Sequence, residues 1–437
     1  MKDFRKYIVF WLSQSISQFG SAMTSFALIL WTYEQSGSAL SVSLMAFCNY
    51  VPYICASLFA GEFVDRYSKK TIMLLVDSVA AVCTVIVLAL TMYDGLAVWN
   101  IYVVNAVIGF MNAFQSPAMA VAIGKMVPQE KLSNVSGMNS FSSNLVSVLN
   151  PVVAAFLFAF GGLQVILLVD LSSFLFAFCV LAFFISIPED GARKEKSNQF
   201  VGTKAGFQYL KKERGLLVIM LTMALINFFS RLTYENILSP MILARSGNDS
   251  VALGAVNAAM GIAGIVGGIV VSIGKSKKNS IKLIYYSAAL SFLFGDILMA
   301  VGRGSILWMI AGAAASFPIP FIMAGQNVIM YKRVPKEIQG SVFAVRNAIQ
   351  FGTIPIGILL GGFLADFYFE PMMQSDSGLS NLLSVLVGKG TGSGMAVMFL
   401  CTGLAGFTIS CMSYRRKAIQ QMKRELDEEN LREDSNL

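Results

Sequence analysis

The sequence predicts an all-α integral membrane protein that crosses the bilayer twelve times. Of its 437 residues, 56% are hydrophobic and only 13% are charged, and the mean hydropathy is +0.66. Twelve apolar stretches of about 20 residues follow one another, and a helix needs that length to cross a hydrocarbon core of roughly 30 Å. A backbone inside the bilayer finds no water to bond, so each stretch is expected to be a helix.

Short polar gaps separate the predicted spans, except for one longer gap in the middle of the chain. The spans are 8–33, 40–61, 72–92, 97–123, 137–160, 163–186, 216–243, 250–273, 282–302, 305–331, 342–366 and 394–413. The long gap divides them six and six. We therefore expect an N-terminal half over 1–186, a cytoplasmic linker over 187–215, a C-terminal half over 216–413 and a cytoplasmic tail over 414–437.

Basic residues fall almost entirely in alternate gaps, and this predicts the orientation of the chain. All but four of the 33 Lys and Arg residues lie on the side of the N-terminus, in the gaps or at the adjoining span ends; the exceptions are Arg231, Arg245, Arg303 and Lys389. Cytoplasmic loops are enriched in Lys and Arg, so both termini are expected in the cytoplasm of a multi-pass plasma-membrane protein. The net charge of +8 then reflects topology and gives no reason to expect nucleic acid binding.

The residue types present restrict the chemistry that the chain can perform. There is no histidine, which removes the commonest metal ligand and the commonest proton relay near neutral pH. The six cysteines all lie within predicted spans without metal-ligand spacing, so we expect free thiols. No nucleotide-binding domain or nucleophile triad is recognisable. We therefore expect no enzyme, no metal and no cofactor, and any proton transfer must use Asp, Glu or Lys.

A short pattern recurs at corresponding places in the two halves. Residues 125–130 (Lys-Met-Val-Pro-Gln-Glu) precede span five, and residues 333–337 (Arg-Val-Pro-Lys-Glu) precede span eleven. Prolines lie deep in the spans that follow and interrupt the spans that precede: Pro151 and Pro355, and Pro117, Pro318 and Pro320. The shared order favours an internal duplication, which is typical of secondary transporters. Interior prolines bend or break helices, as helices that rock during transport require.

The loop between spans two and three carries the most specific motif. The run 61–70, Gly-Glu-Phe-Val-Asp-Arg-Tyr-Ser-Lys-Lys, resembles the signature loop of the major facilitator superfamily. The resemblance implies twelve helices in two pseudo-symmetric halves, and a loop that latches the cytoplasmic side in one conformation. The residues that match are Gly61, Asp65, Arg66, Lys69 and Lys70. Ser68 stands where the family usually has a second glycine.

Several shorter runs resemble the macrolide-efflux branch of this superfamily. They are 36–40, 75–77, 114–118, 169–170, 320–321, 325–326 and 340–343. This resemblance implies export of amphiphilic compounds driven by the proton gradient. Two departures weaken the standard coupling mechanism. No Lys or Arg occurs between Lys70 and Lys125, where coupled exporters often carry an arginine, and glycines do not flank Pro151.

Charged residues inside the spans are the candidates for ion coupling. A charge at the bilayer centre costs roughly 2.5–3.5 kcal/mol on insertion scales. Arg231 and Glu235 lie four residues apart in span seven, on one helix face. Either they form a neutralised structural pair, or Glu235 exchanges a proton whose affinity Arg231 sets. Asp77 is a further coupling candidate, although the family resemblance favours a gating role for it. Asp170 and Asp296 are expected to pack or to accept buried hydrogen bonds.

Neutral polar residues in several spans are candidates for lining a substrate cavity. They are Gln14, Gln18, Asn105, Asn112, Asn227, Gln326, Asn327, Asn347 and Gln350. The same groups can instead bridge helices. Outside the spans, residues 367–393 are expected to form a flexible outer connection, and the charged tail after Tyr414 is expected to be a short helix that frays.

Together these patterns predict a secondary transporter that exports a small amphiphilic compound, such as a macrolide-like antibiotic, by proton antiport through alternating access. Its expected partners are that substrate, protons and the lipid bilayer, and it is expected to act as a monomer. Two alternatives stay open. One is transport of an endogenous metabolite with other coupling; the other is a non-transporting receptor or immunity protein on the same fold.

Overall fold

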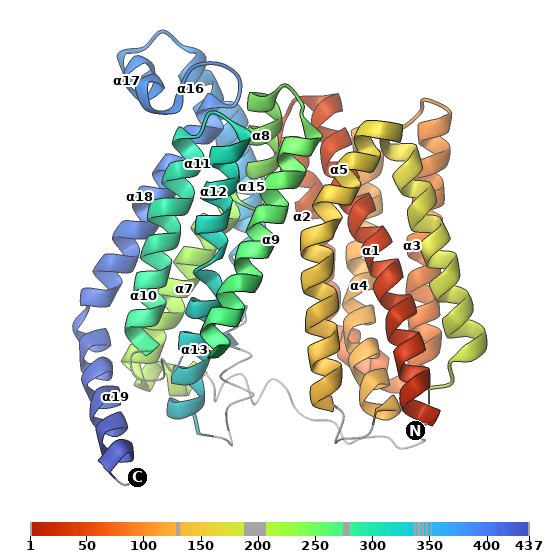
Figure 1. The fold of residues 1–437 in the computed structure, drawn as a ribbon, viewed down its shortest axis with the longest axis horizontal. Coiled ribbons are helices and arrows are strands. Elements are labelled where there is room, and N and C mark those ends of the chain that lie inside the picture. The colour runs from red at the N-terminus through yellow and green to blue at the C-terminus, as the bar shows by residue number, and fades with distance from the viewer. Residues whose placement is uncertain are drawn as a thin grey trace. The chain divides into compact units, whose positions relative to one another are not determined.

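The computed structural model describes residues 2–127, 132–187, 207–273, 280–335 and 352–435, together with 338, 342, 345–346 and 348–350. Across these residues the regular structure is helical, without a strand (Figure 1). The all-α prediction is confirmed.

Long helices make up the first part of the chain. They are α1 (Lys2–Ser36), α2 (Ala39–Arg66), α3 (Lys69–Met92), α4 (Val98–Met126), α5 (Leu132–Cys179) and the π-helical segment η2 (Val180–Phe184). α5 contains a sharp kink at Gly162, whose φ of 64° suits a residue without a Cβ. The kink falls between the predicted spans 137–160 and 163–186, so α5 holds two membrane helices joined by a tight turn.

The second part of the chain has shorter helices, because its spans are interrupted. They are α7 (Arg214–Thr233), α8 (Leu238–Ser246), α9 (Ser250–Ile273), α10 (Ser280–Leu290), η3 (Ser291–Asp296), α11 (Ile297–Val301), α12 (Ser305–Ser316), α13 (Ile319–Arg333), α15 (Ile354–Leu364), η5 (Ala365–Phe369), α16 (Glu370–Gln374), α17 (Gly378–Val387), α18 (Ser393–Arg415) and α19 (Lys417–Ser435). The segments η3 and η5 are π-helical.

Prolines account for the interruptions in spans seven and ten. Span seven was predicted as one helix, but α7 and α8 are separated by a turn at 234–237. Pro240 lies in the first turn of α8, where its ring clashes with the carbonyl four residues earlier, at Asn236, and offers it no N–H. Between α12 and α13 the break falls at Phe317 and Pro318, one of the predicted interruptions.

Ten stretches within the described residues are long and apolar enough to cross a membrane. Nine of them each overlap one predicted span, and the tenth, Val148–Phe184, covers the two spans joined at Gly162. α1 covers the remaining predicted span, 8–33, but is too polar to be among the ten. The number twelve stays a sequence prediction.

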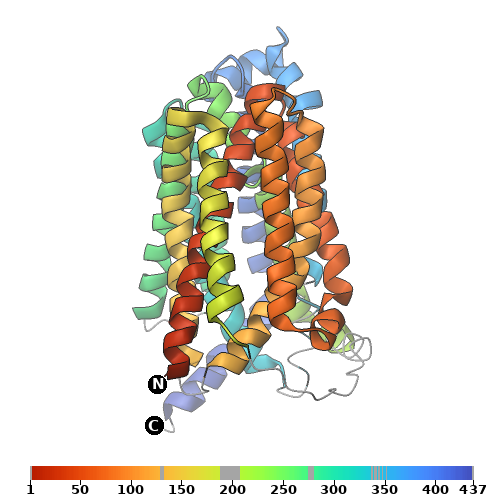
Figure 2. The same cartoon turned by 90° about the vertical axis from the view of Figure 1, so that its right-hand side faces the viewer.

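The chain divides into two compact units. The first comprises Met1–Glu195 with Asn248–Ala258, and the second comprises Lys196–Gly247 with Ala259–Leu437. In the first unit α1 packs on α5 and α2 packs on α4, as two perpendicular views show (Figures 1 and 2). In the second unit α7 packs on α15 and α18, and α10 packs on α13 and α18. Each unit therefore buries its own hydrophobic core.

Two segments are more ordered than the sequence suggested. The outer connection 367–393 was expected to be flexible, but it forms α16 and α17. The tail forms α19, and it buries Ile419 and Met422 in the core of the second unit. The helix expected in the tail is therefore present, whereas the outer connection was misjudged because its glycines and serines suggested a loop although its apolar residues recur at helical spacing.

Candidate functional site

The strongest candidate from the sequence lies where span seven is interrupted. Arg231 occupies the last turn of α7 and Glu235 lies in the turn that follows. Their side chains form an ion pair, with 34% of the Arg231 side chain and 27% of the Glu235 side chain exposed. Both side chains of the pair are thus partly buried and partly accessible to solvent.

Residues on either side of Glu235 anchor the turn to neighbouring helices. Asn236 is fully buried, and its Nδ2 donates to the carbonyl of Ile358 in α15 at 2.6 Å. The Tyr234 hydroxyl is buried beside the carboxylate of Asp296, and its ring packs edge-on against Phe399 at 5.2 Å between centroids. The break therefore has a defined geometry, and Glu235 lies between two fixed neighbours.

Asp296 belongs to a buried polar cluster that includes this turn. Its side chain is 1% exposed at the end of η3, and its Oδ2 accepts a hydrogen bond of 2.8 Å from the Thr402 hydroxyl of α18. A buried carboxyl group needs such donors, because an unsatisfied polar group costs about 1–3 kcal/mol. Asp296, Thr402 and Tyr234 join three helices of the second unit.

Asp170 forms a comparable cluster in the first unit. It is 5% exposed, and its carboxylate accepts hydrogen bonds from Thr24 at 2.9 Å, Ser21 at 3.1 Å and Thr84 at 3.3 Å. These donors come from α1 and α3, while Asp170 lies in the second membrane helix of α5. The buried hydrogen bonds expected for Asp170 and Asp296 are therefore present.

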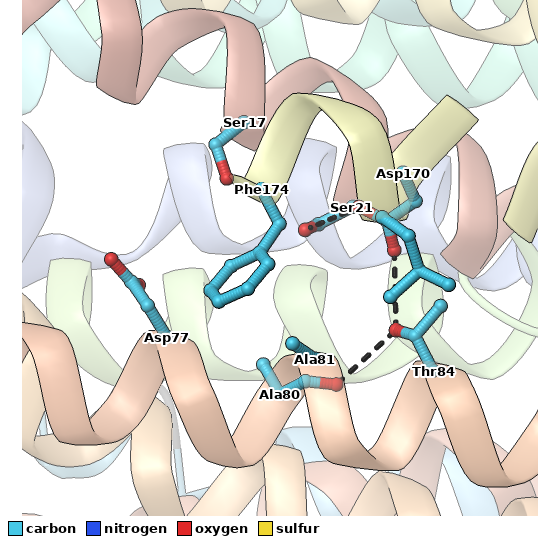
Figure 3. Close-up of a pocket in the computed structure, with 9 residues that line it drawn as sticks. Ser17, Ser21, Asp77, Ala80, Ala81, Thr84, Asp170 and Phe174 are labelled. Carbon is cyan, nitrogen blue, oxygen red and sulfur yellow. Dashed lines mark hydrogen bonds between the residues drawn. The ribbon is translucent and has the colours of Figure 1, made fainter. Parts of the chain in front are cut away.

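Asp77 lies on the edge of a small cavity that it shares with Asp170. The cavity has a volume of about 30 Å³, enough for about one water molecule. It is lined by Ser17, Ser21, Asp77, Ala80, Ala81, Thr84, Asp170, Leu171 and Phe174. Figure 3 shows the Phe174 ring between the side chains of Asp77 and Asp170. Asp77 Oδ1 also accepts a hydrogen bond of 3.0 Å from Gln115 of α4.

Two interactions fix the signature loop: a serine that caps α3, and a lysine that bonds to carbonyls more than a hundred residues away in the chain. Ser68 accepts a hydrogen bond from the backbone of Thr71 and caps α3 with a φ of −58°. No glycine conformation is needed there, which explains why serine is tolerated. Lys69 donates to its neighbour Tyr67, whereas Lys70 reaches the carbonyls of Ala182 and Ile185, each at 2.8 Å. The side chains of the other matching residues, Gly61, Asp65 and Arg66, lie outside the described part.

The predicted cavity residues are distributed over both units. In the first unit they are Gln14 and Gln18 of α1 and Asn105 and Asn112 of α4; in the second they are Asn227 of α7, Gln326 and Asn327 of α13, and Gln350. Asn347 lies outside the described residues. Asn105 bonds its own helix at Ile101, and Asn327 accepts from Arg346 at 3.2 Å. None of the described ones lines the cavity beside Asp77.

Three of these residues carry a buried amide group with spare hydrogen-bonding capacity. Gln14, Gln326 and Gln350 are 8%, 8% and 9% exposed, and within the described part of the chain the Nε2 atom of each has no hydrogen-bond partner. Buried amide groups are normally satisfied, so each such group needs an explanation. The sequence marked these residues as polar but contained no sign of which ones would be buried donors.

Sequence analysis overlooked the hydroxyl donors around the buried carboxylates. Thr24, Thr84 and Thr402 are small residues in apolar helices, and nothing in their local sequence marks them as donors. The one available signal was the presence of Asp170 and Asp296 within apolar spans, since an intramembrane carboxylate requires partners.

The apolar helices define a polytopic helical membrane protein, and comparison with known proteins gives its family. Residues 10–358 match the Major Facilitator Superfamily. The chain belongs to that superfamily and is a membrane transporter of its type.

Two curated relatives and one solved structure agree with this assignment. Macrolide efflux protein A of Streptococcus pyogenes is 25% identical over 370 residues, which cover 83% of this chain and 89% of that protein. Multidrug efflux pump Tap of Mycolicibacterium fortuitum is 23% identical over 361 residues, covering 79% and 86%. The crystal structure of a bacterial homologue of the iron transporter ferroportin has the same fold, with a TM-score of 0.66, 14% identity, and coverage of 94% and 99%.

Proposed function

We propose that this transporter exports a small amphiphilic compound, of macrolide-like character, across the plasma membrane by proton antiport. The observation that carries the proposal is the partly exposed ion pair of Arg231 and Glu235 at the break in span seven. The names of the two efflux relatives support the direction and the substrate class. The predicted topology, with both termini in the cytoplasm, is part of the same proposal.

Glu235 is proposed to be the group that exchanges the proton. When Glu235 is ionised, Arg231 neutralises it, and when Glu235 is protonated the attraction is lost and Arg231 becomes free to move. Because the two residues flank the end of α7, such a change acts on the point where the helix is already interrupted. Broken helices supply substrate and ion sites in secondary transporters, and this supports a coupling role over a purely structural one.

The buried amides of Gln14, Gln326 and Gln350 are proposed to donate hydrogen bonds to the substrate. Each has an Nε2 group without a protein partner in the described residues, and all three are on predicted cavity-lining spans. Amide N–H groups suit a ligand rich in carbonyl, ether or hydroxyl oxygens. A macrolide has this character, with apolar surface between its oxygens.

The signature loop is proposed to control opening of the cytoplasmic side. Asp65 and Arg66 are at the end of α2, and one residue, Tyr67, separates Arg66 from the Ser68 cap that begins α3. The connection between these two helices of the first unit is therefore only two residues long. Asp77, further along α3, is proposed to take part by joining that helix to Gln115 of α4.

The test compares two kinds of transport in proteoliposomes for the wild type, Glu235→Gln and the control Asp376→Asn, which neutralises an exposed carboxylate outside the apolar helices. A macrolide such as erythromycin is the probe. We expect Glu235→Gln to retain exchange of labelled for unlabelled macrolide but to lose accumulation driven by a pH gradient. The control should retain both.

Unchanged gradient-driven accumulation in Glu235→Gln would contradict the coupling role. No macrolide movement in the wild type, with folded protein in the vesicles, would instead contradict the substrate class and favour one of the two alternatives named from the sequence.

A further inference from the structure

Helix α17 buries Ser380 against the protein and has most of its apolar side chains outward. Ser380 is 3% exposed, whereas Leu379, Leu382, Val385 and Leu386 are between 50% and 76% exposed. These four apolar residues recur at the spacing of one helix face. A helix on the surface of a water-soluble domain has the opposite arrangement.

Hydrogen bonds on the polar side hold α17 in this orientation. Ser377 caps its first turn by accepting from the backbone of Ser380 at 3.1 Å, and the Ser380 hydroxyl donates to the carbonyl of Met373 at 3.0 Å. At the other end Arg245 donates to the carbonyl of Val387 at 2.6 Å, and Arg303 donates to that of Val385 at 3.3 Å. The outward position of the leucines is therefore a property of the fold.

The end of the second unit that carries α17 has a further exposed apolar residue. α17 contacts α11 and α18 at one end of the second unit (Figure 1). Ile306, in the first turn of α12, is 78% exposed three residues after Arg303. α12 belongs to a stretch that is long and apolar enough to cross a membrane, so acyl chains are the expected surroundings of Ile306.

Two cations stand beside the C-terminal end of α17. Arg303 contacts it directly, and Lys389 follows it and donates to Asn381 at 3.0 Å. Cationic side chains next to an apolar helix face suit the boundary where phosphate headgroups meet acyl chains. In water the four apolar side chains would stay exposed, whereas an acyl-chain layer would bury them, which is the favourable direction of transfer.

We propose that α17 is an interfacial helix that lies on the phospholipid bilayer. Leu379, Leu382, Val385 and Leu386 enter the acyl-chain layer, while Arg303 and Lys389 face the headgroup phosphates. The occupant of this face is the leaflet at this end of the second unit, which is the outer leaflet in the predicted topology. The inference does not depend on the substrate or on proton coupling.

The experiment places a bimane fluorophore at single cysteines in the full-length protein, with the six native cysteines replaced by serine or alanine. The test positions are Leu382→Cys and Val385→Cys, and the control is Asp376→Cys in the connection before α17. Labelled protein is reconstituted in phosphatidylcholine vesicles, with either brominated acyl chains or iodide in the buffer as quencher. We expect bromolipid to quench positions 382 and 385 and iodide to quench position 376.

Two results would overturn the proposal. Strong iodide quenching at 382 and 385 without bromolipid quenching would show that α17 stands in water. Protection from both quenchers would show that its apolar face is covered by protein, such as a second copy of the chain. A matched pair of unlabelled variants, Leu382→Ser and Asp376→Ser, checks that the fold is retained by comparison of their melting temperatures.

Discussion

Thr402 and Asp296 are joined by a hydrogen bond of 2.8 Å from hydroxyl to carboxylate, within the buried part of the second unit. In the first unit Thr24 donates to Asp170 at 2.9 Å. With the spans counted as the sequence predicts, Asp170 and its donors join spans six, one and three, while Asp296, Thr402 and Tyr234 join spans nine, twelve and seven. Under the proposed duplication these are the same three helices of each half, although the carboxylate comes from the sixth helix in one and the third in the other.

Replacing Thr402 by valine should destabilise the second unit. The change keeps the side-chain volume but leaves the buried Asp296 without its hydroxyl donor, at a cost of about 1–3 kcal/mol. We expect a lower melting temperature for Thr402→Val in detergent, and near wild-type behaviour for Thr402→Ser. Thr408→Val is the matched control, because that exposed hydroxyl bonds only its own helix at Leu404. Equal melting temperatures for the two valine variants would contradict a stabilising role for the contact.

Lys70 should matter more for stability than its neighbour Lys69. The Lys70 ammonium satisfies two carbonyls at the end of the sixth span, where the last helical carbonyls have no partner within the helix. We expect Lys70→Met to cost about 1–3 kcal/mol and Lys69→Met to change stability by less than about 0.5 kcal/mol. Thermal unfolding of the purified variants measures both. If Lys70→Met melts like the wild type but transports more slowly, the residue serves the gating loop alone.

Gly109 should not tolerate a side chain. A Cβ at this position would lie 2.1 Å from the backbone oxygen of Asn49, so α4 could accommodate it only by moving away from α2. We expect Gly109→Ala to cost about 1–3 kcal/mol, as overpacking usually does. Gly264→Ala in α9 is the control, because a Cβ there meets nothing within 4 Å and alanine favours a helix by roughly 0.5–1 kcal/mol. Folded yield and melting temperature report the difference; tolerance of alanine at 109 would show that the two helices are less closely packed.

Local properties of the chain were sufficient for the fold class and the family. The length of an apolar stretch, the side on which basic residues gather and the pattern of a ten-residue loop can all be recognised without knowing any distant contact. The turn at Gly162 and the break at Pro318 also follow from single residues, because glycine permits a positive φ and proline cannot continue the hydrogen-bond ladder. Arg231 and Glu235 were paired correctly because residues four apart on a helix are neighbours.

Contacts between distant segments required the three-dimensional packing. Thr24 and Asp170 are 146 residues apart in the chain, and no periodicity within either helix indicates that they meet. The same holds for the two carbonyls that Lys70 reaches and for the outward face of α17. Which side of a short amphipathic helix meets protein and which meets lipid depends on where its neighbours place donors and acceptors. The orientation of such a helix is therefore decided only when the helices assemble, because the isolated segment exposes both of its faces equally.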